Sequence, residues 1–315
     1  KFFKATNHNV VNNPKVKKII QDGRQHLLTT STSYDVITAE PPPPRSAGSV
    51  NLYTREYYEL TKRALKPGGI VSQWIPLHSQ AETHVYQNFR TFYESFPYVM
   101  AWYPVKKELI LIGSNQPINL EFQGIEQRLQ NPVINKIMRD IDFPNPFSFL
   151  GSIWFLKKEL KNLGSGQHVI SDNNPSLEFY LNSYTKVISG DDIEKIMIKR
   201  ASFEDVWGKI TKPSLVTTSG DICGIGGTCT GSTISDVVFT KDVFKKHWDS
   251  RRKADHAEAD YIRGNALRIE GRISEAISHY KMAIKLDPDF ALAHYNLGFA
   301  LMKKGNNSEA ISHYK

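Results

Sequence analysis

An eight-residue segment that occurs twice near the C-terminus constrains the fold more than any other feature of this 315-residue chain. Ser-Glu-Ala-Ile-Ser-His-Tyr-Lys occupies positions 274–281 and returns unchanged at positions 308–315. Three further pairs keep the same offset: Gly264 and Gly298, Leu267 and Leu301, Gly271 and Gly305. An ordinary helical hairpin would not give so many identities at one spacing, so the pattern indicates a repeated structural unit.

The period and residue pattern resemble the tetratricopeptide repeat, a pair of antiparallel helices of about 34 residues that stacks on its neighbours. The resemblance implies that Gly264 and Ala276 let the two helices of a unit approach, while Tyr280 and Ala283 contact the next unit. The repeat region is residues 251–315, with units at 257–290 and 291–315. We expect the second unit to be incomplete and the parent chain to continue. The repeats imply a protein-binding surface, but they name no partner.

The first part of the chain alternates between strand and helix patterns. Tyr34 to Glu40 is an apolar run that ends in a carboxylate and is followed by four prolines. Residues 52–65 are typical of a helix, and 70–75 of a strand. An earlier apolar run, residues 16–21, leads into Asp22-Gly23-Arg24 and predicts another strand. This alternation through residue 114 predicts an α/β fold with a parallel sheet covered on both faces.

These segments together resemble the polyamine aminopropyltransferases, the spermidine synthase family. The resemblance rests on Asp-Gly-Arg at 22–24, Tyr-Asp-Val-Ile at 34–37, Leu-Tyr-Thr-Arg-Glu-Tyr-Tyr at 52–58 and Leu-Lys-Pro-Gly-Gly-Ile-Val at 65–71. Trp-Ile-Pro-Leu at 74–77 and Asp-Asn-Asn-Pro-Ser-Leu-Glu-Phe at 172–179 resemble the bacterial members that are fused to a membrane transporter-like segment. The similarity covers about residues 1–182, which we assign to a Rossmann-like domain. It implies decarboxylated S-adenosylmethionine as co-substrate and a small-molecule amine as acceptor, with no tightly bound cofactor.

Glu40 is the candidate catalytic residue. At neutral pH an amine nucleophile is protonated, and a carboxylate near the line of attack can take its proton and hold the cationic substrate. The family has an aspartate at this strand end, and Glu40 matches its position with a side chain one methylene longer. A second family aspartate, which precedes a proline and binds the amine, corresponds here to Pro43. Recognition of the amine must therefore differ from the usual pattern. The alternative for Glu40 is a solvated residue after a buried strand.

The remaining candidate site residues follow from the same resemblance. Asp22 matches the carboxylate that contacts the adenine amino group, and Gly23 allows close approach. The alternative for Asp22 is a turn aspartate that caps the helix beginning near Gln25. Tyr53 and Gln73 match positions near the active site and are assigned to substrate binding.

The beginning of the chain resembles the middle of the family's fold. Residues 1–9 resemble the helix after the second strand, so the first strand, its glycine-rich loop and the acidic ribose-binding residue would precede this sequence. We therefore expect a fragment that is inactive by itself.

Composition excludes several other classes. The net charge of +8 arises from short basic pairs spread along the chain, which argues against nucleic-acid binding. No run of eighteen apolar residues is present, so any membrane contact would come through segments outside this chain. Cys223 and Cys229 lack partners for a zinc site, and we expect no metal. Residues 183–250 form a connector with a Gly/Ser/Thr-rich stretch at 214–232 that lacks the lysine of a phosphate loop.

The sequence thus predicts a truncated Rossmann-like α/β domain, a connector and a tetratricopeptide array. The resemblance implies an aminopropyltransferase, placed at the cytoplasmic face of a bacterial membrane. Two alternatives stay open: an adaptor whose α/β domain has lost catalysis, and an S-adenosylmethionine-dependent methyltransferase.

Overall fold

The computed structural model describes residues 10–42, 48–77, 80–105, 108–141, 143–177, 196, 199–211 and 241–314. The helix expected at residues 1–9, and the stretch 214–232 with Cys223 and Cys229, lie outside these residues.

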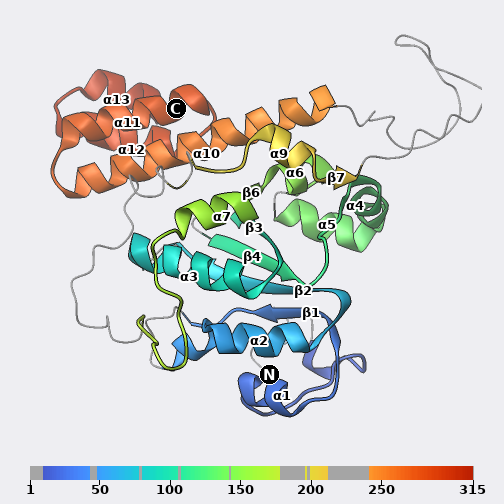
Figure 1. Ribbon diagram of the computed structural model, residues 1–315. Helices are drawn as coiled ribbons and strands as arrows, with labels where there is room; N and C mark the ends of the chain where they lie inside the picture. The colour runs from blue at the N-terminus through green and yellow to red at the C-terminus, as the bar shows by residue number, and fades with distance from the viewer. Residues whose placement is uncertain are drawn as a thin grey trace, which may run out of the picture.

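The described residues form an α/β unit followed by helical hairpins, which confirms the predicted fold class (Figure 1). The strands are β1 (Tyr34–Ala39), β2 (Leu65–Pro76), β3 (Tyr98–Val105), β4 (Glu108–Ser114), β5 (Leu120–Glu121), β6 (Ile153–Leu156) and β7 (Ile210–Thr211). The α-helices of the first part are α1 (Gly23–Thr29), α2 (Arg55–Arg63), α3 (Glu82–Ser95), α4 (Phe122–Leu129), α5 (Pro132–Asp140), α6 (Pro146–Gly151), α7 (Lys157–Leu163) and α9 (Phe203–Trp207). The last four helices are α10 (Lys241–Ile269), α11 (Ile273–Leu286), α12 (Ala291–Lys303) and α13 (Asn307–His313). Two 3-10 helices, η1 (Val10–Asn12) and η2 (Ser49–Leu52), complete the set.

The main sheet is mixed rather than wholly parallel. Its order is β1-β2-β4-β3-β6, with β1 and β2 parallel and the other three pairs antiparallel. β1, β2 and β3 therefore run in one direction, and β4 and β6 in the other. The predicted parallel arrangement fails at β4 because the link between β3, which ends at Val105, and β4, which begins at Glu108, is too short for a crossover connection.

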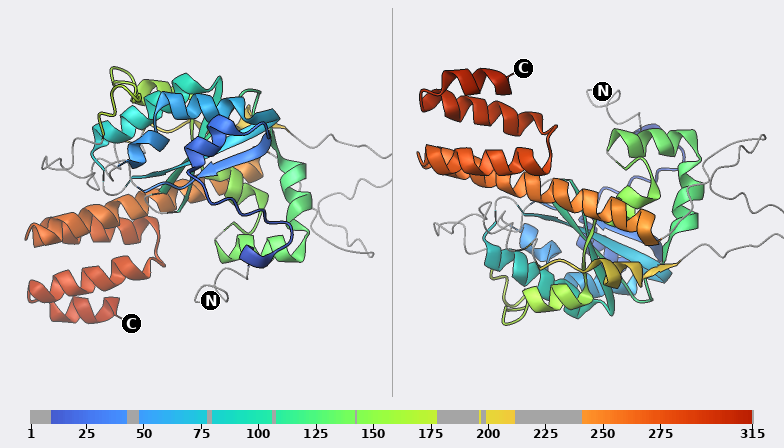
Figure 2. Two further views of the ribbon diagram at one scale, coloured as in Figure 1. Left: turned by 90° about the horizontal axis from the view of Figure 1, so that it is seen from below. Right: turned by 90° about the horizontal axis from the view of Figure 1, so that it is seen from above.

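Helices cover both faces of this sheet. Figure 2 shows α2, α3 and α7 on one side and α10 on the other. Aromatic residues fill the core under α2 and α3, where the rings of Phe92 and Phe96 lie 4.9 Å apart and Tyr58 meets Phe92 edge-on at 5.1 Å. β1 forms one edge of the described sheet, so no described strand pairs with its outer side.

The strand expected at residues 16–21 is absent from the structure. These residues have no regular secondary structure, and the side chains of Val16, Ile19 and Ile20 are exposed. An apolar pattern forms a strand only where a neighbouring strand supplies hydrogen bonds, and no described strand pairs with this segment.

The repeat spacing is visible in the helices, since the starts of α11 at Ile273 and α13 at Asn307 keep the offset of the repeated segment. A Cβ added at Gly264 would lie 2.6 Å from the ring of Tyr280, and one at Gly298 would lie 2.7 Å from the ring of Tyr314. Each glycine therefore lets a tyrosine ring pack against the helix backbone. Tyr280 is fully buried, whereas Tyr314 is 43% exposed.

The two repeats differ at one polar pair. In the first, His279 Nδ1 lies 2.8 Å from Asp260 Oδ1; in the second, His313 Nδ1 lies 3.0 Å from His294 Nδ1. His294 Nε2 also lies 3.0 Å from the carbonyl oxygen of Pro288, to which it can donate a hydrogen bond. Burial, and then the charge of His294, lower the pKa of His313.

A buried ion pair joins α10 to the preceding part of the chain. Arg200 Nη1 donates to Asp255 Oδ2 at 2.6 Å, and the two side chains are 2% and 5% exposed. The guanidinium lies over the ring of Trp154, 5.7 Å from its centroid. Burial lowers the pKa of Arg200, while the charge of Asp255 and its hydrogen bond act in the opposite direction. The first part of α10 also packs into the core through Phe244 and Trp248. α10 is thus part of both the α/β unit and the first repeat.

Among the described residues, no helix has the length and apolar character needed to cross a membrane.

Candidate functional site

The predicted site residues Asp22, Gly23 and Glu40 line one cavity that runs beside β1, from Tyr34 at the start of the strand to Glu40 just after its carboxyl end. Its volume is about 530 Å³, within the roughly 300–1,000 Å³ of small-molecule sites. Asp22 and Gly23 come from the start of α1, and Glu40 is the first residue after β1. Two separate segments of the sequence therefore contribute to one surface.

Glu40 stands at the mouth of this cavity. Its side chain is exposed, and it has no hydrogen-bond or ion-pair partner among the described residues. Pro41, the next residue, is buried and fixes the direction in which the chain leaves the strand. The carboxylate is therefore available to a ligand or to water.

Asp22 has a structural role in addition to its place in the cavity. It is the N-cap of α1, and its Oδ1 accepts a hydrogen bond of 2.8 Å from the amide of Gln25. The capping alternative considered for this residue is therefore realised. A carboxylate has a second oxygen, so capping leaves acceptor capacity for a ligand. No other atoms lie within 4 Å of the Cβ position of Gly23, so the chain is open at this point.

Tyr53 lies beside the loop that follows Glu40 and does not line the cavity. The tyrosine is fully buried, and its hydroxyl donates to the carbonyl oxygens of Pro42 at 3.3 Å and Pro41 at 3.5 Å. Burial, with a smaller contribution from neighbouring Tyr57, raises its pKa well above the ordinary value, so the hydroxyl remains a donor. Tyr53 therefore orients the proline loop rather than the ligand.

Gln73 lies deep in the sheet next to the site. It pairs in register with Ala39, the residue before Glu40, and is fully buried. Its Nε2 donates to the carbonyl of Trp74 at 3.3 Å, and its Oε1 has no partner among the described residues. Gln73 is one strand away from the cavity and does not line it.

Sequence reasoning missed three aromatic residues of the cavity: His26, Tyr34 and Tyr57. His26 Nε2 and the hydroxyl of Tyr34 are 2.8 Å apart and link α1 to the first residue of β1. Burial raises the pKa of Tyr57 to about 12, against a smaller opposing effect of Arg24. The sequence contained one feature that could have indicated His26 as a site residue: it lies one helical turn after Asp22, so the two side chains share a face of α1.

A long-range contact holds α1 against the rest of the site. Arg24 binds both carboxylate oxygens of Asp172, and its Nη1 also donates to the carbonyl of Asn51 at 2.7 Å. The amide of Asp172 in turn donates to Glu56 Oε2 at 3.0 Å. Partial burial opposes ionisation of Asp172, but the hydrogen bonds from Arg24 and Thr54 outweigh it and lower the pKa. Three motifs that are far apart in the sequence thus meet at the start of α1.

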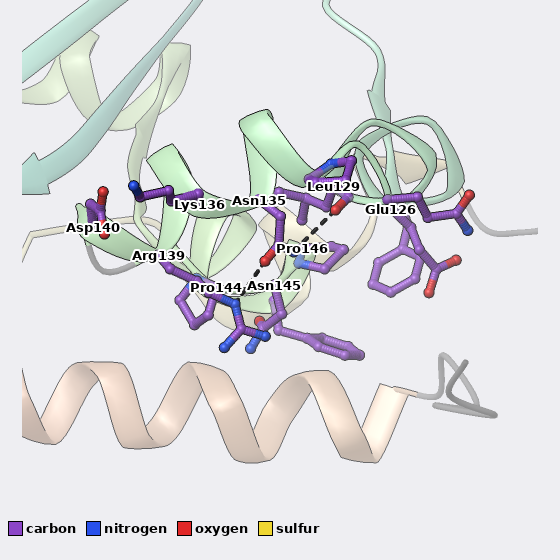
Figure 3. A pocket seen from close by; sticks show the side chains of 13 residues that line it. Glu126, Leu129, Asn135, Lys136, Arg139, Asp140, Pro144, Asn145 and Pro146 are labelled. Carbon is purple, nitrogen blue, oxygen red and sulfur yellow. Dashed lines mark hydrogen bonds between the residues drawn. The ribbon is translucent and has the colours of Figure 1, made fainter. Parts of the chain in front are cut away.

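A larger cavity of about 820 Å³ lies between α4, α5 and α6 (Figure 3). Pro144, Pro146 and Phe147 supply apolar surface there, and the charged lining side chains are of both signs: Lys136, Arg139, Glu126 and Asp140. It contains none of the predicted site residues. No group of three or more His, Cys, Asp or Glu residues within the described residues is arranged to hold a metal ion.

Comparisons with known proteins agree with the motifs. The family model of the spermine/spermidine synthase domain matches residues 1–114, and that of the TPR repeat matches residues 264–305. Two relatives named polyamine aminopropyltransferase, from Escherichia coli O139:H28 (strain E24377A / ETEC) and from Escherichia coli (strain K12 / DH10B), are each 39% identical over 66 residues. That match covers 20% of this chain and 23% of each relative, so the chain spans about a quarter of their length.

Among solved structures, a probable spermidine synthase from Corynebacterium glutamicum ATCC 13032 is 17% identical, with a TM-score of 0.37. The similarity covers 54% of this chain and 59% of that one. The resemblance predicted from the sequence motifs is confirmed by the family models: the chain carries a spermine/spermidine synthase domain match in its first third and a tetratricopeptide repeat near its C-terminus.

Proposed function

We propose that the α/β part of this protein transfers an aminopropyl group from decarboxylated S-adenosylmethionine to an amine. The observation that carries the proposal is the cavity beside β1 that Asp22, Gly23 and Glu40 share, with Glu40 at the carboxyl end of that strand. Both substrates are cationic at neutral pH, one through its sulfonium and amine and the other through its ammonium groups. Two exposed carboxylates at one cavity suit such ligands electrostatically.

In this proposal Glu40 is the general base. The amine nitrogen attacks the methylene carbon next to the sulfonium, a carbon–nitrogen bond forms, and the carbon–sulfur bond breaks with its electron pair left on sulfur as a neutral thioether. The nitrogen loses a proton, which Glu40 accepts directly or through one water. Asp22 holds the nucleoside end of the co-substrate, and Gly23 allows its close approach. Tyr53 acts through the proline loop, and Gln73 supports the amine-binding side from the neighbouring strand.

One observation supports the alternative of a non-catalytic adaptor: Pro43 stands where the family has an amine-binding aspartate. A methyltransferase remains the third candidate, because it would use a similar sheet.

The test incubates the full-length parent protein with decarboxylated S-adenosylmethionine and a panel of diamines and polyamines, and products are read by mass spectrometry. Glu40→Gln should reduce the yield of aminopropylated product at least 100-fold, since general-base catalysis contributes roughly 10²–10⁴-fold. Glu59→Gln, a change of an exposed carboxylate on α2, is the matched control and should leave the yield unchanged. A methylated product from S-adenosylmethionine would support the methyltransferase, and absence of product with absence of co-substrate binding would support the adaptor.

We further propose that the repeats bind a protein partner and that the full-length protein acts at the cytoplasmic face of a bacterial membrane. The proposed division of the chain is 1–182 for the catalytic domain, 183–250 for the connector and 251–315 for the repeats. α10 is continuous across the last boundary.

A further inference from the structure

The helix α5 turns its apolar side outward. None of its residues is buried, although a surface helix normally places its apolar side against the core. Four large aliphatic side chains at or just after this helix are exposed by 67%, 39%, 55% and 47%: Val133, Ile134, Ile137 and Ile141. Their spacings put them on one side of the helix. A contiguous apolar surface of this kind marks an interaction site.

The polar side of α5 faces the rest of the protein. Asn135 Nδ2 donates to the carbonyl of Leu129 at the end of α4, 3.0 Å away, and Arg139 Nε donates to Asn135 Oδ1 at 2.7 Å. Lys136, Arg139 and Asp140 also line the cavity that α5 shares with α4 and α6 (Figure 3). The helix is therefore attached through its polar side, and its apolar side cannot turn inward without breaking these contacts.

Two charged residues border the apolar side along one edge. Lys136 and Asp140 lie four residues apart, so they follow each other along that edge. Neither has an ion-pair or hydrogen-bond partner among the described residues. On the opposite edge, the side chain next to the aliphatic residues is that of Met138. A fitting partner needs an apolar surface with an anion and a cation along one edge in the reverse order, and an antiparallel copy of α5 has this pattern.

We infer that α5 pairs with α5 of a second copy of this chain, as two antiparallel helices related by a two-fold axis near Ile137. In this arrangement Ile137 lies opposite its own equivalent, and Val133 lies opposite Ile141 of the second copy. The axis keeps the charged edges of both helices on the same side and reverses their order, which brings Lys136 within reach of Asp140 of the second copy. A parallel pair would instead place these charges against the uncharged edge. The inference does not depend on the proposed aminopropyl transfer.

A lipid surface is the other occupant that an exposed apolar helix face suits. Helices that lie in a membrane interface carry lysine and arginine along the polar side, where these residues meet anionic lipids. In α5 an acidic residue, Asp140, lies directly beside the apolar side, and the polar side is held against α4 and α6. The self-complementary order of the charges favours a second copy over a bilayer.

The test follows the oligomeric state of the full-length parent protein by sedimentation velocity over a range of concentrations. Because one pair of short helices gives a small interface, we expect a dimer that dissociates on dilution. Ile137→Gln should raise the Kd of this dimer at least about tenfold, since it removes an aliphatic side chain from both copies at the axis. Ile269→Gln, which changes an exposed isoleucine of α10, is the matched control and should leave the Kd unchanged.

Exchange of the two edge charges tests the order of the pairing. Lys136→Glu places a second carboxylate beside Asp140 of the other copy, and Asp140→Lys places a second cation beside Lys136. Each single variant should weaken the dimer several-fold. The double variant restores opposite charges and should recover the wild-type Kd.

Cysteine variants in a cysteine-free background test the antiparallel direction. Ile137→Cys should form an intermolecular disulfide with itself under oxidation. Val133→Cys should not, because its two copies would lie about 12 Å apart along the helices, too far for a disulfide. A mixture of Val133→Cys and Ile141→Cys should form one.

Three results would overturn the inference. The first is sedimentation as a monomer at all concentrations, or as a dimer that Ile137→Gln and the charge variants leave intact. The second is a disulfide formed by Val133→Cys alone, which would mean a parallel pair. The third is binding to anionic vesicles that Ile137→Gln abolishes, without a dimer in solution, which would make the occupant a lipid surface. Aminopropyl transfer is read from its products and stands or falls separately.

Discussion

Replacing Asp255 by asparagine removes the charge that balances Arg200 in the interior of the protein. The two side chains are 2% and 5% exposed, so water cannot compensate the guanidinium once the carboxylate is lost. A second cation, the Nε of Arg251, lies 3.7 Å from the other oxygen of Asp255 and would be left facing the first. Breaking a buried pair in this way costs roughly 3–5 kcal/mol. Asparagine keeps one acceptor for Arg200, so we expect a loss of about 3 kcal/mol in the free energy of unfolding, at the lower end of that range.

The measurement is a urea titration followed by tryptophan fluorescence, since Trp154 lies against the guanidinium and reports the local transition. Asp249→Asn on the same helix is the matched control. Its pair with Lys245 has both side chains 50% exposed, so the substitution should cost no more than about 0.5 kcal/mol. The double variant Arg200→Met with Asp255→Leu removes both charges and should be close to wild type or more stable. Equal losses for Asp255→Asn and Asp249→Asn, or a double variant as unstable as Asp255→Asn, would refute the reasoning.

Three further predictions concern the repeats and the site. Gly264→Ala should lower the free energy of unfolding by about 1–3 kcal/mol, because the added methyl group overpacks against a buried ring. Gly298→Ala faces an exposed ring that can move, so it should raise the free energy of unfolding by up to ~1 kcal/mol through the higher helix propensity of alanine. Equal shifts of the two melting temperatures would contradict this. The lowered pKa of His313 means that the folded state binds fewer protons than the unfolded state, so stability is fully present above about pH 6.5 and declines as the pH falls below it. Facing charges on Glu309 and Lys281 act in opposite directions. His294→Asp, which restores the pair of the first repeat, leaves the effect of burial but replaces a like charge by an opposite one, so it should reduce the decline between pH 7.5 and 5.5; an unchanged difference in melting temperature would argue against the pair. Tyr53→Phe should reduce aminopropyl transfer several-fold while changing stability by only about 1 kcal/mol, and a rate equal to wild type would show that the proline loop needs no such anchor.

Local patterns in the sequence predicted the elements well. The apolar run before Glu40 is β1, the expected helix at 52–65 contains α2, and the period of the repeated segment reappears in the starts of α11 and α13. Each of these depends on residues close together in the chain, where periodicity and helix-ending signals act directly.

Features that depend on distant partners were not predictable. Residues 16–21 have a strand-like pattern but no strand beside them among the described residues, and the hydroxyl of Tyr53 turned out to bond to the loop after Glu40 rather than to line the cavity. His26 became part of the site only because α1 packs beside the first residue of β1. The contact between Arg24 and Asp172 spans 148 positions, a separation over which sequence pattern carries no information about proximity.

The unbroken helix α10 gives the protein a mechanical property. Its 29 residues correspond to a rod of about 43 Å. One end is held in the core of the α/β unit by Phe244, Trp248 and the Asp255 ion pair, and the other end is the first helix of the repeats. Because α10 is one continuous helix, a displacement of the repeats would be transmitted along it to the core that holds Phe244 and Trp248.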